Sequence, residues 1–263
     1  MTVRMSVRIA SMRGRLLPNG RRDLLRQFCL FGGAYLSYRI VEGAVGGNAA
    51  AAFRHSGQLI SFERTLHLFV EPSIQGWAAH SHLLLVIATY VYLNAQTTML
   101  VCVLLYLYIA HNRHYYRVRN MLLVAMVIAL LTYALYPTAP PRLLPEWGFI
   151  DTNSYITGVP NTNAVANEFV NQYAAIPSMH VAFAVMLAWP LTRLVRRRVV
   201  RVLWALWPVV IVFITIITGN HFLIDAVLGL AAAGVSAVVA SRLDAIRAHV
   251  WAPEPASSPV ATT

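Results

Sequence analysis

Six stretches of this chain are apolar over the length that an α-helix needs to cross a lipid bilayer. They cover residues 28–47, 83–110, 120–138, 178–193, 199–218 and 221–241, and a hydrocarbon core about 30 Å thick takes about 20 helical residues. The composition agrees, because 58% of the 263 residues are hydrophobic and only 12% are charged, whereas soluble domains carry about 25% charged residues. We therefore expect an all-α, polytopic membrane protein, a six-transmembrane-helix bundle. The same numbers disfavour a soluble enzyme and exclude a disordered chain.

The basic residues follow the positive-inside rule. All 21 are Arg, the chain has no Lys, and the net charge is +11. The main clusters lie between apolar segments, at Arg4–Arg26, Arg113–Arg119, Arg193–Arg201 and Arg242–Arg247. Splitting the second apolar segment at Asn94 and Ala95 would place the first cluster across the membrane from the others, so the charges favour six spans with both termini in the cytoplasm. We interpret the positive charge as a topology signal and expect no nucleic-acid partner.

The domain organisation follows from these spans. We expect a basic cytoplasmic N-terminal segment over residues 1–27, a six-helix membrane domain over 28–241 and a partly disordered cytoplasmic tail over 242–263. The first apolar run is about 20 residues long and contains Arg39 and Glu42, which fits a retained helix better than the h-region of a signal peptide. The spacing of these two residues, i and i+3, indicates a mutually neutralising pair. Cys29 and Cys102 lie in apolar segments and are interpreted as packing residues.

Two longer connections are expected on the outer side of the membrane, over residues 48–82 and 139–177. The first contains LISFERTLHLFVEPSIQGW, a mixture of apolar and charged residues that suits a short helix lying in the interface. Its Glu63, Arg64 and Glu71 are interpreted as a gate for lipid entry. The second is long for a structureless loop, which is typical of a functional segment. Its asparagine side chains could bind a headgroup or could be ordinary loop residues, and the sequence leaves both interpretations open. These residues are Asn153, Asn161, Asn163, Asn167 and Asn171.

Three polar clusters lie at membrane ends that this topology places together on the outer side. They are YPTAPPR (136–142), IPSMH (176–180) and TGNHFLID (218–225). In the last cluster, His221 and Asp225 are four residues apart and share one helical face. An aspartate that accepts a proton from one imidazole nitrogen leaves the other nitrogen free as a nucleophile or base. We therefore expect a catalytic His221 oriented by Asp225.

The other two clusters offer groups that bind an anion. Ser178 is expected to cap a helix that has Met179 and His180 in its first turn, and free amides at such a helix start bind phosphate. Arg142 follows two prolines, and its planar guanidinium suits phosphate oxygens. We expect the amides near Ser178 and Met179 to bind phosphate together with Arg142, and His180 to act as general acid and base. This scheme needs no metal and no cofactor.

Contacts to a headgroup or lipid are expected from three residues in or near these clusters. They are Tyr136, Tyr173 and Asn220.

The three clusters together resemble the signature of the type 2 phosphatidic acid phosphatase superfamily, which reads K-x6-R-P, P-S-G-H and S-R-x5-H-x3-D. The resemblance covers roughly residues 28–241. It implies that His221 is the phosphohistidine nucleophile, that Asp225 assists it and that His180 is the general acid. It also implies phosphate binding by Arg142 and Ser178.

The positions at which the chain departs from this signature indicate which branch of the superfamily it resembles. Leu135 stands in place of the lysine, Leu143 in place of the proline and Met179 in place of the glycine. Ile214 and Thr215 replace the Ser-Arg pair, so one phosphate-binding arginine is absent. The chain is similar to the branch that contains inositol phosphorylceramide synthase. The motifs of that branch match Pro140–Arg142, Tyr173–His180 and His221–Asp225.

This resemblance implies a lipid phosphatase or an inositolphosphotransferase-like enzyme. Its substrate would be a lipid phosphate or a phosphoinositol lipid, its partners membrane lipids, and its active site would face the extracytoplasmic side of a bacterial plasma membrane. Hydrolysis and transfer to an acceptor alcohol stay open, as does the oligomeric state. Two non-enzymatic alternatives also stay open: a transporter whose ionisable residues relay protons, and a haem protein with His180 and His221 as axial ligands. A red protein with a Soret band would identify the haem protein.

Overall fold

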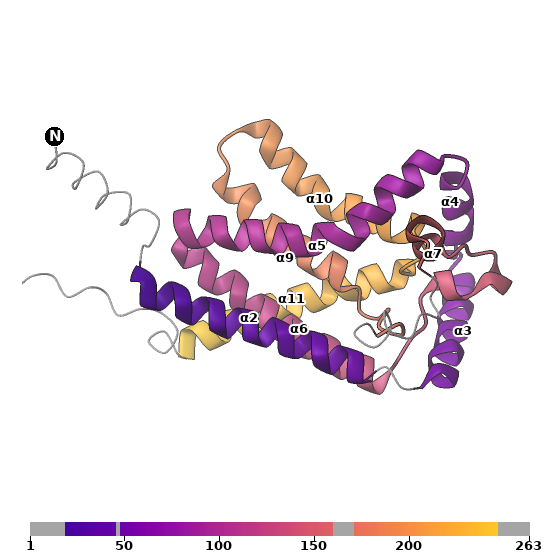
Figure 1. Cartoon of the computed structure of the whole chain (residues 1–263), viewed down its shortest axis with the longest axis horizontal. Coiled ribbons are helices and arrows are strands. Elements are labelled where there is room, and N and C mark those ends of the chain that lie inside the picture. Colours follow the sequence, from indigo (N-terminus) through magenta and orange to yellow (C-terminus); the bar gives the residue numbers. More distant parts are fainter. Residues whose placement is uncertain (1–18, 46–47, 160–170, 247–263) are drawn as a thin grey trace, which may run out of the picture.

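The structure, a computed structural model, has helices and no strands among the residues it describes, which are 19–45, 48–159 and 171–246. Six helices run roughly along the length of the molecule, and the other helices gather at one end (Figure 1). The lengthwise helices are α2 (Gly20–Val45), α5 (His82–Ala110), α6 (Asn112–Leu135), α9 (Met179–Leu194), α10 (Arg198–Ile217) and α11 (Leu223–Ile246). Most of the expected N-terminal segment, the expected tail from residue 247, and Asn161, Asn163 and Asn167 lie outside the described residues.

Four of these helices are long and apolar enough to cross a membrane. They are α5, α6, α10 and the Leu223–Leu243 part of α11. Helix α9 has only 16 residues, and α2 begins with the charged residues Arg21, Arg22 and Asp23. The prediction of an all-helical protein of membrane type is confirmed, whereas the count of six spans is not established by length and hydropathy.

The helix ends differ from the predicted spans at the Arg-rich side. Helix α5 continues through Asn94 and Ala95 without a break, as the charge distribution indicated. Helix α6 begins at Asn112 instead of residue 120, and α2 begins at Gly20 instead of residue 28. Hydropathy detects only the part of a helix that faces hydrocarbon, so the charged turns beyond it are missed.

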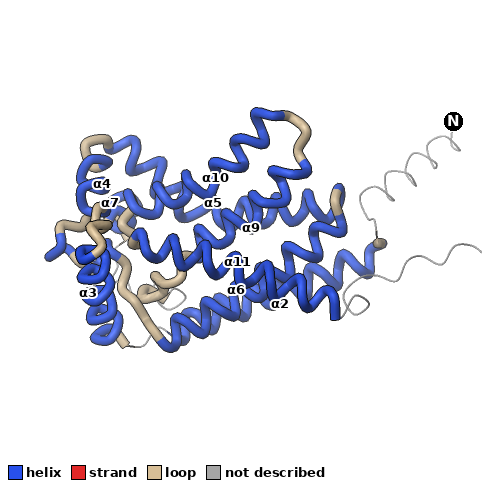
Figure 2. The backbone as a smooth tube through the Cα atoms, turned by 180° about the vertical axis from the view of Figure 1, so that it is seen from behind, coloured by secondary structure: helices blue, strands red, loops and turns tan. Residues whose placement is uncertain are grey.

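The two ends of the bundle have different characters. The start of α2, the α5–α6 turn, the α9–α10 turn and the end of α11 lie toward one end, near the described arginine clusters (Figures 1 and 2). The other end, here called the loop end, carries α3 (Ala49–Thr65), α4 (Glu71–Ala78) and α7 (Thr152–Thr157). Helix α3 lies across this end of the bundle (Figure 1). The single interfacial helix predicted for the first outer connection is therefore two helices, which meet at the turn around His67.

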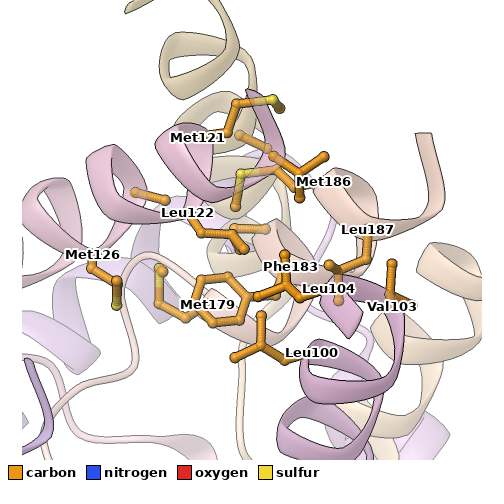
Figure 3. Packing of buried hydrophobic residues seen from close by; sticks show 14 of the residues in the cluster. Leu100, Val103, Leu104, Met121, Leu122, Met126, Met179, Phe183, Met186 and Leu187 are labelled. Atoms are coloured by element: carbon orange, nitrogen blue, oxygen red, sulfur yellow. The ribbon is translucent and has the colours of Figure 1, made fainter. Parts of the chain in front are cut away.

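The largest buried cluster holds α9 between α5 and α6. Met179, Phe183, Met186 and Leu187 lie on one face of α9, at the spacing that places side chains on a single helical stripe. Figure 3 shows this face packed against leucine, valine and methionine side chains of α5 and α6. Because Met179 begins the helix and is 4% exposed, the core fixes the position of the first turn of α9, which carries His180.

Helices α9 and α11 approach closely at Gly229. A Cβ atom added there would lie 2.4 Å from the carbonyl oxygen of Ser178, so an alanine would push α11 away from the start of α9. We expect Gly229→Ala to lower the free energy of unfolding by about 1–3 kcal/mol, as overpacking of a core does. Thermal unfolding of the purified protein in detergent measures this. Gly234→Ala on the same helix is the control, since nothing lies within 4 Å of its added Cβ, and an equal loss in both variants would contradict the steric explanation.

Candidate active site

His221 lies in the short loop between α10 and α11 and is 3% exposed. Its Nδ1 atom is 2.9 Å from the carbonyl oxygen of Ala175 and 3.4 Å from Oδ2 of Asp225. A carbonyl oxygen only accepts hydrogen bonds, so Nδ1 carries the proton and the lone pair lies on Nε2. The arrangement therefore leaves Nε2 as the free, nucleophilic nitrogen.

Asp225 is fully buried beneath His221, at the third position of α11. Its Oδ2 atom accepts a hydrogen bond from the backbone amide of Phe222 at 2.9 Å, the return contact of a capping box. The nearest hydrogen-bond acceptor for the His221 ring is thus the Ala175 carbonyl, and Asp225 comes second. Sequence motifs did not indicate Ala175, because a backbone carbonyl 46 residues away leaves no residue-type signal.

His180 is the second residue of α9, and its ring faces the same region. The ring centroids of His180 and His221 are 5.8 Å apart. The His180 ring stacks on Tyr92 of α5, with centroids 4.1 Å apart and planes 23° apart. Tyr92 was not among the predicted site residues, since a tyrosine in an apolar helix is indistinguishable from a packing residue in one sequence.

Ser178 caps α9 as predicted. Its hydroxyl accepts a hydrogen bond from the amide of Val181 at 3.4 Å, and the side chain is fully buried. The hydroxyl is thus occupied by the cap, and Ser178 does not line the cavity described below. The amides of Met179 and His180 belong to the first turn, where the helix offers no partner for an amide. These amides, and not the serine side chain, are the anion-binding groups that the helix start can supply.

Arg142 reaches the site from a 3-10 turn, Pro141–Leu143. Its backbone amide donates to the carbonyl of Gly219 at 2.7 Å, and Nε of its guanidinium donates to the side-chain oxygen of Asn220 at 3.0 Å. A terminal nitrogen lies 3.6 Å from the carboxylate of Asp151. Gly219, whose carbonyl accepts from Arg142, has a positive φ of 64°, a backbone conformation that favours glycine.

These groups surround one cavity of about 300 Å³. Its lining includes the predicted residues Arg142, Met179, His180, Asn220 and His221. Two predicted headgroup contacts do not line it. Tyr136 stacks on His55 and donates to Gln58, and the Tyr173 ring packs edge-on against Phe53.

Two buried glutamates hold the start of α11. The backbone amide of Leu223 donates to Glu71 at 2.7 Å, and that of Ile224 donates to Glu63 at 2.9 Å. Burial raises the pKa of Glu63 to about 8, and the neighbouring Glu71 and Asp225 add to this rise. Both glutamates are at most 1% exposed, so the interpretation as a gate for lipid entry gives way to a capping role. The described residues contain no group of three His, Cys, Asp or Glu side chains that could hold a metal ion.

A sequence profile of the PAP2 superfamily matches residues 57–239. The chain belongs to the PAP2 superfamily. No curated protein and no solved structure matches it. Membership in the PAP2 superfamily indicates an enzyme of phosphatase or phosphotransferase type and disfavours the transporter and the haem protein. The match begins within α3, so α2 lies outside the PAP2 part of the chain.

The pKa of the buried His221 in this PAP2 protein is lowered. Burial, together with the Arg142 cation, lowers the pKa of His221 to about 4, against an opposing contribution from the Ala175 hydrogen bond. The ring therefore stays neutral, with its Nε2 lone pair free, as the pH falls through the ordinary histidine range, and gains a proton only near pH 4.

We expect the ring protons of His221, followed by NMR, to titrate with a midpoint near 4. The resonance is assigned by its absence from the His221→Gln variant. A midpoint of His221 near the ordinary histidine value of 6.5 would contradict the buried, neutral ring.

Proposed function

We propose that this protein is an integral-membrane lipid phosphatase or phosphotransferase that works through a phosphohistidine at Nε2 of His221. The observation that carries the proposal is the convergence of two histidine rings, 5.8 Å apart, and Arg142 on one cavity. PAP2 membership supports the reaction class, and the neutral tautomer of His221 supplies the nucleophile.

In the first step, Arg142 and the free amides at the start of α9 hold the phosphate oxygens of the substrate. Nε2 of His221 attacks phosphorus and forms a P–N bond while the bond from phosphorus to the leaving oxygen breaks. The electron pair of that bond goes to the leaving oxygen, and His180 gives it a proton. The Ala175 carbonyl and Asp225 stabilise the cationic ring of the intermediate.

In the second step, His180 removes a proton from water or from an acceptor alcohol. The resulting oxygen attacks phosphorus, the P–N bond breaks and its electron pair returns to His221. Water yields free phosphate or a phosphorylated headgroup, and an alcohol yields a new phosphate ester. Which product forms depends on whether the cavity admits water or a second alcohol.

The lipid nature of the substrate is proposed from the surroundings of the cavity. The helices expose large apolar side chains, such as Leu83, Leu135 and Val199, so a substrate reaches the site through a hydrocarbon environment. The positive-inside rule assigns the Arg-rich end to the cytoplasm and the loop end, with the cavity, to the extracytoplasmic side of a bacterial plasma membrane. We propose six spans on the same basis, with α2 and α9 as the two shorter or more polar ones.

The experiment is incubation of the purified protein with ³²P-labelled lipid phosphates and phosphoinositol lipids, with and without acceptor alcohols. Free labelled phosphate indicates hydrolysis, and a new labelled lipid indicates transfer. We expect one of these products and, on acid-free quenching, label on the protein that is stable to alkali and labile to acid, as a P–N bond is. The absence of both products with every lipid of the panel would contradict the proposal.

A further inference from the structure

Helix α2 contributes charged side chains to the cavity. Arg39 and Glu42 line it together with Gln96 of α5 and Asn171, which precedes α9. We call these four residues the α2 wall. Because α2 lies outside the PAP2 match, the motifs of the superfamily do not account for Arg39 and Glu42. An ionisable pair in a helix of a membrane bundle is costly and points to function.

The charges of the α2 wall cancel. A terminal nitrogen of Arg39 lies 2.6 Å from Oε2 of Glu42, whose side chain is only 9% exposed. An anion placed against this pair would be repelled by Glu42 as well as attracted by Arg39. The wall therefore suits a neutral polar group better than a second phosphate.

Two side chains of the α2 wall have unused hydrogen-bonding capacity. Oε1 of Gln96 and Nδ2 of Asn171 are buried and have no hydrogen-bond partner among the described residues. Asn171 is 6% exposed, and its other amide atom accepts from the backbone of Tyr173. Buried polar atoms without partners are unfavourable and rare. One of these atoms accepts and the other donates, which a hydroxyl group can match on both sides.

The size of the cavity agrees with a ligand larger than phosphate. Cavities of about 300 Å³ are at the lower end of those that hold small organic ligands, and this one has that volume. His180, His221 and Arg142 account for the binding of the phosphate. The α2 wall is then available to the group that is esterified to the phosphate or that binds beside it.

We infer that Glu42, Gln96 and Asn171 form a subsite for a neutral, hydroxyl-rich group. This inference rests on the proposed function, and it names the alcohol of that reaction. The alcohol has two sources, because it is either esterified to the phosphate that binds at His221 or arrives separately as the acceptor. Arg39 holds the Glu42 carboxylate in place and neutralises it.

The test measures binding to the purified full-length protein by calorimetry. The probes are phosphonates, because nucleophilic attack at phosphorus does not break their P–C bond. The probes are methylphosphonate, the phosphonate analogue of inositol 1-phosphate, and free inositol in the presence of saturating methylphosphonate. We expect the inositol phosphonate to bind at least about tenfold more tightly than methylphosphonate, as satisfied buried hydrogen bonds allow. Tight binding of free inositol identifies an acceptor site, and its failure identifies the esterified alcohol as the ligand.

Three variants assign this preference to the α2 wall. Gln96→Leu and Asn171→Leu should each reduce the preference severalfold and leave methylphosphonate affinity unchanged. The double variant Arg39→Met/Glu42→Met removes both charges together and should do the same. Asn94→Leu is the matched control on α5, since its exposed amide donates to the Tyr90 carbonyl of its own helix, and it should change nothing.

Two results would overturn the subsite. One is equal affinity of the wild-type protein for both phosphonates, with no binding of inositol. The other is a loss of methylphosphonate affinity in the double variant, which would make Arg39 a phosphate ligand. Turnover of ³²P-lipids without this selectivity would refute the subsite and support the proposed function. Selectivity without turnover would support the subsite and contradict the proposed function.

Discussion

Replacement of His221 by Ala should lower kcat by about 10⁴-fold or more, the range found when a catalytic nucleophile is removed. The reason is that Nε2 of His221 is the protein atom that bonds to phosphorus in the proposed reaction. Without it, Arg142 and the amides of α9 still bind phosphate, so KM or the affinity for a phosphonate should change little. The variant should also fail to take up ³²P, and steady-state kinetics with a quenched labelling experiment measures both effects.

His180→Ala separates the general acid from the nucleophile. The loss of the proton donor should cost about 10²–10⁴-fold with a lipid leaving group. The loss should be much smaller with a nitrophenyl phosphate, whose leaving oxygen needs no proton. Labelling of the protein should persist in this variant and be absent from His221→Ala.

The control is His80→Ala, because His80 is exposed and hydrogen-bonds to carbonyls of the preceding helix. It should leave kcat unchanged. Near wild-type turnover of the true substrate by His221→Ala, with the variant correctly folded, would contradict the phosphohistidine mechanism.

Local patterns predicted the parts of the site that depend on short spacing. Ser178 caps α9 as the motif indicated. His221 and Asp225 are adjacent as their spacing predicted, although His221 lies in the loop two residues before α11 begins and not on a helical face shared with Asp225. The alternation of arginine clusters with apolar segments also predicted that His180, His221 and Arg142 meet at one end of the bundle, and the structure brings all three to one cavity.

The remaining parts depend on contacts between distant segments. The Ala175 carbonyl and Tyr92 act through a backbone group and a ring face, which residue type does not reveal. Arg39 and Glu42 look like a self-neutralising pair in sequence, and they are one, yet they also line the cavity. Glu63 and Glu71 lie in a charged segment that resembles a surface helix, and only the fold buries them against α11.

Loss of one of these two glutamates should lower both the activity and the stability of the protein. Three consecutive backbone amides at the start of α11, those of Phe222, Leu223 and Ile224, each donate to a different buried carboxylate. An amide left without its acceptor in a buried site costs about 1–3 kcal/mol. His221 directly precedes this turn, so a shift of the turn also moves the nucleophile. We expect Glu71→Ala to lower kcat by about 10²-fold, as a displacement near 1 Å does, and to lower stability by about 1–3 kcal/mol.

Activity measured well below the unfolding temperature separates positioning from stability. Glu71→Gln keeps an oxygen that accepts from Leu223 and should recover most of kcat, and exposed Glu146→Ala at the same end is the control. If Glu71→Ala retained full kcat despite its lower stability, the glutamate would be structural alone.

Glu63 makes the arrangement sensitive to pH in a defined direction. Its pKa is about 8 in the folded protein against an ordinary 4.5, so between these values the folded protein holds a proton that the unfolded chain has lost. Its contribution to stability is complete below 4.5 and declines as the pH rises to about 8. Glu63→Gln resembles the protonated carboxyl group and should flatten this decline in thermal unfolding measured across the range. An unchanged decline in the variant would contradict the raised pKa of Glu63 as its cause.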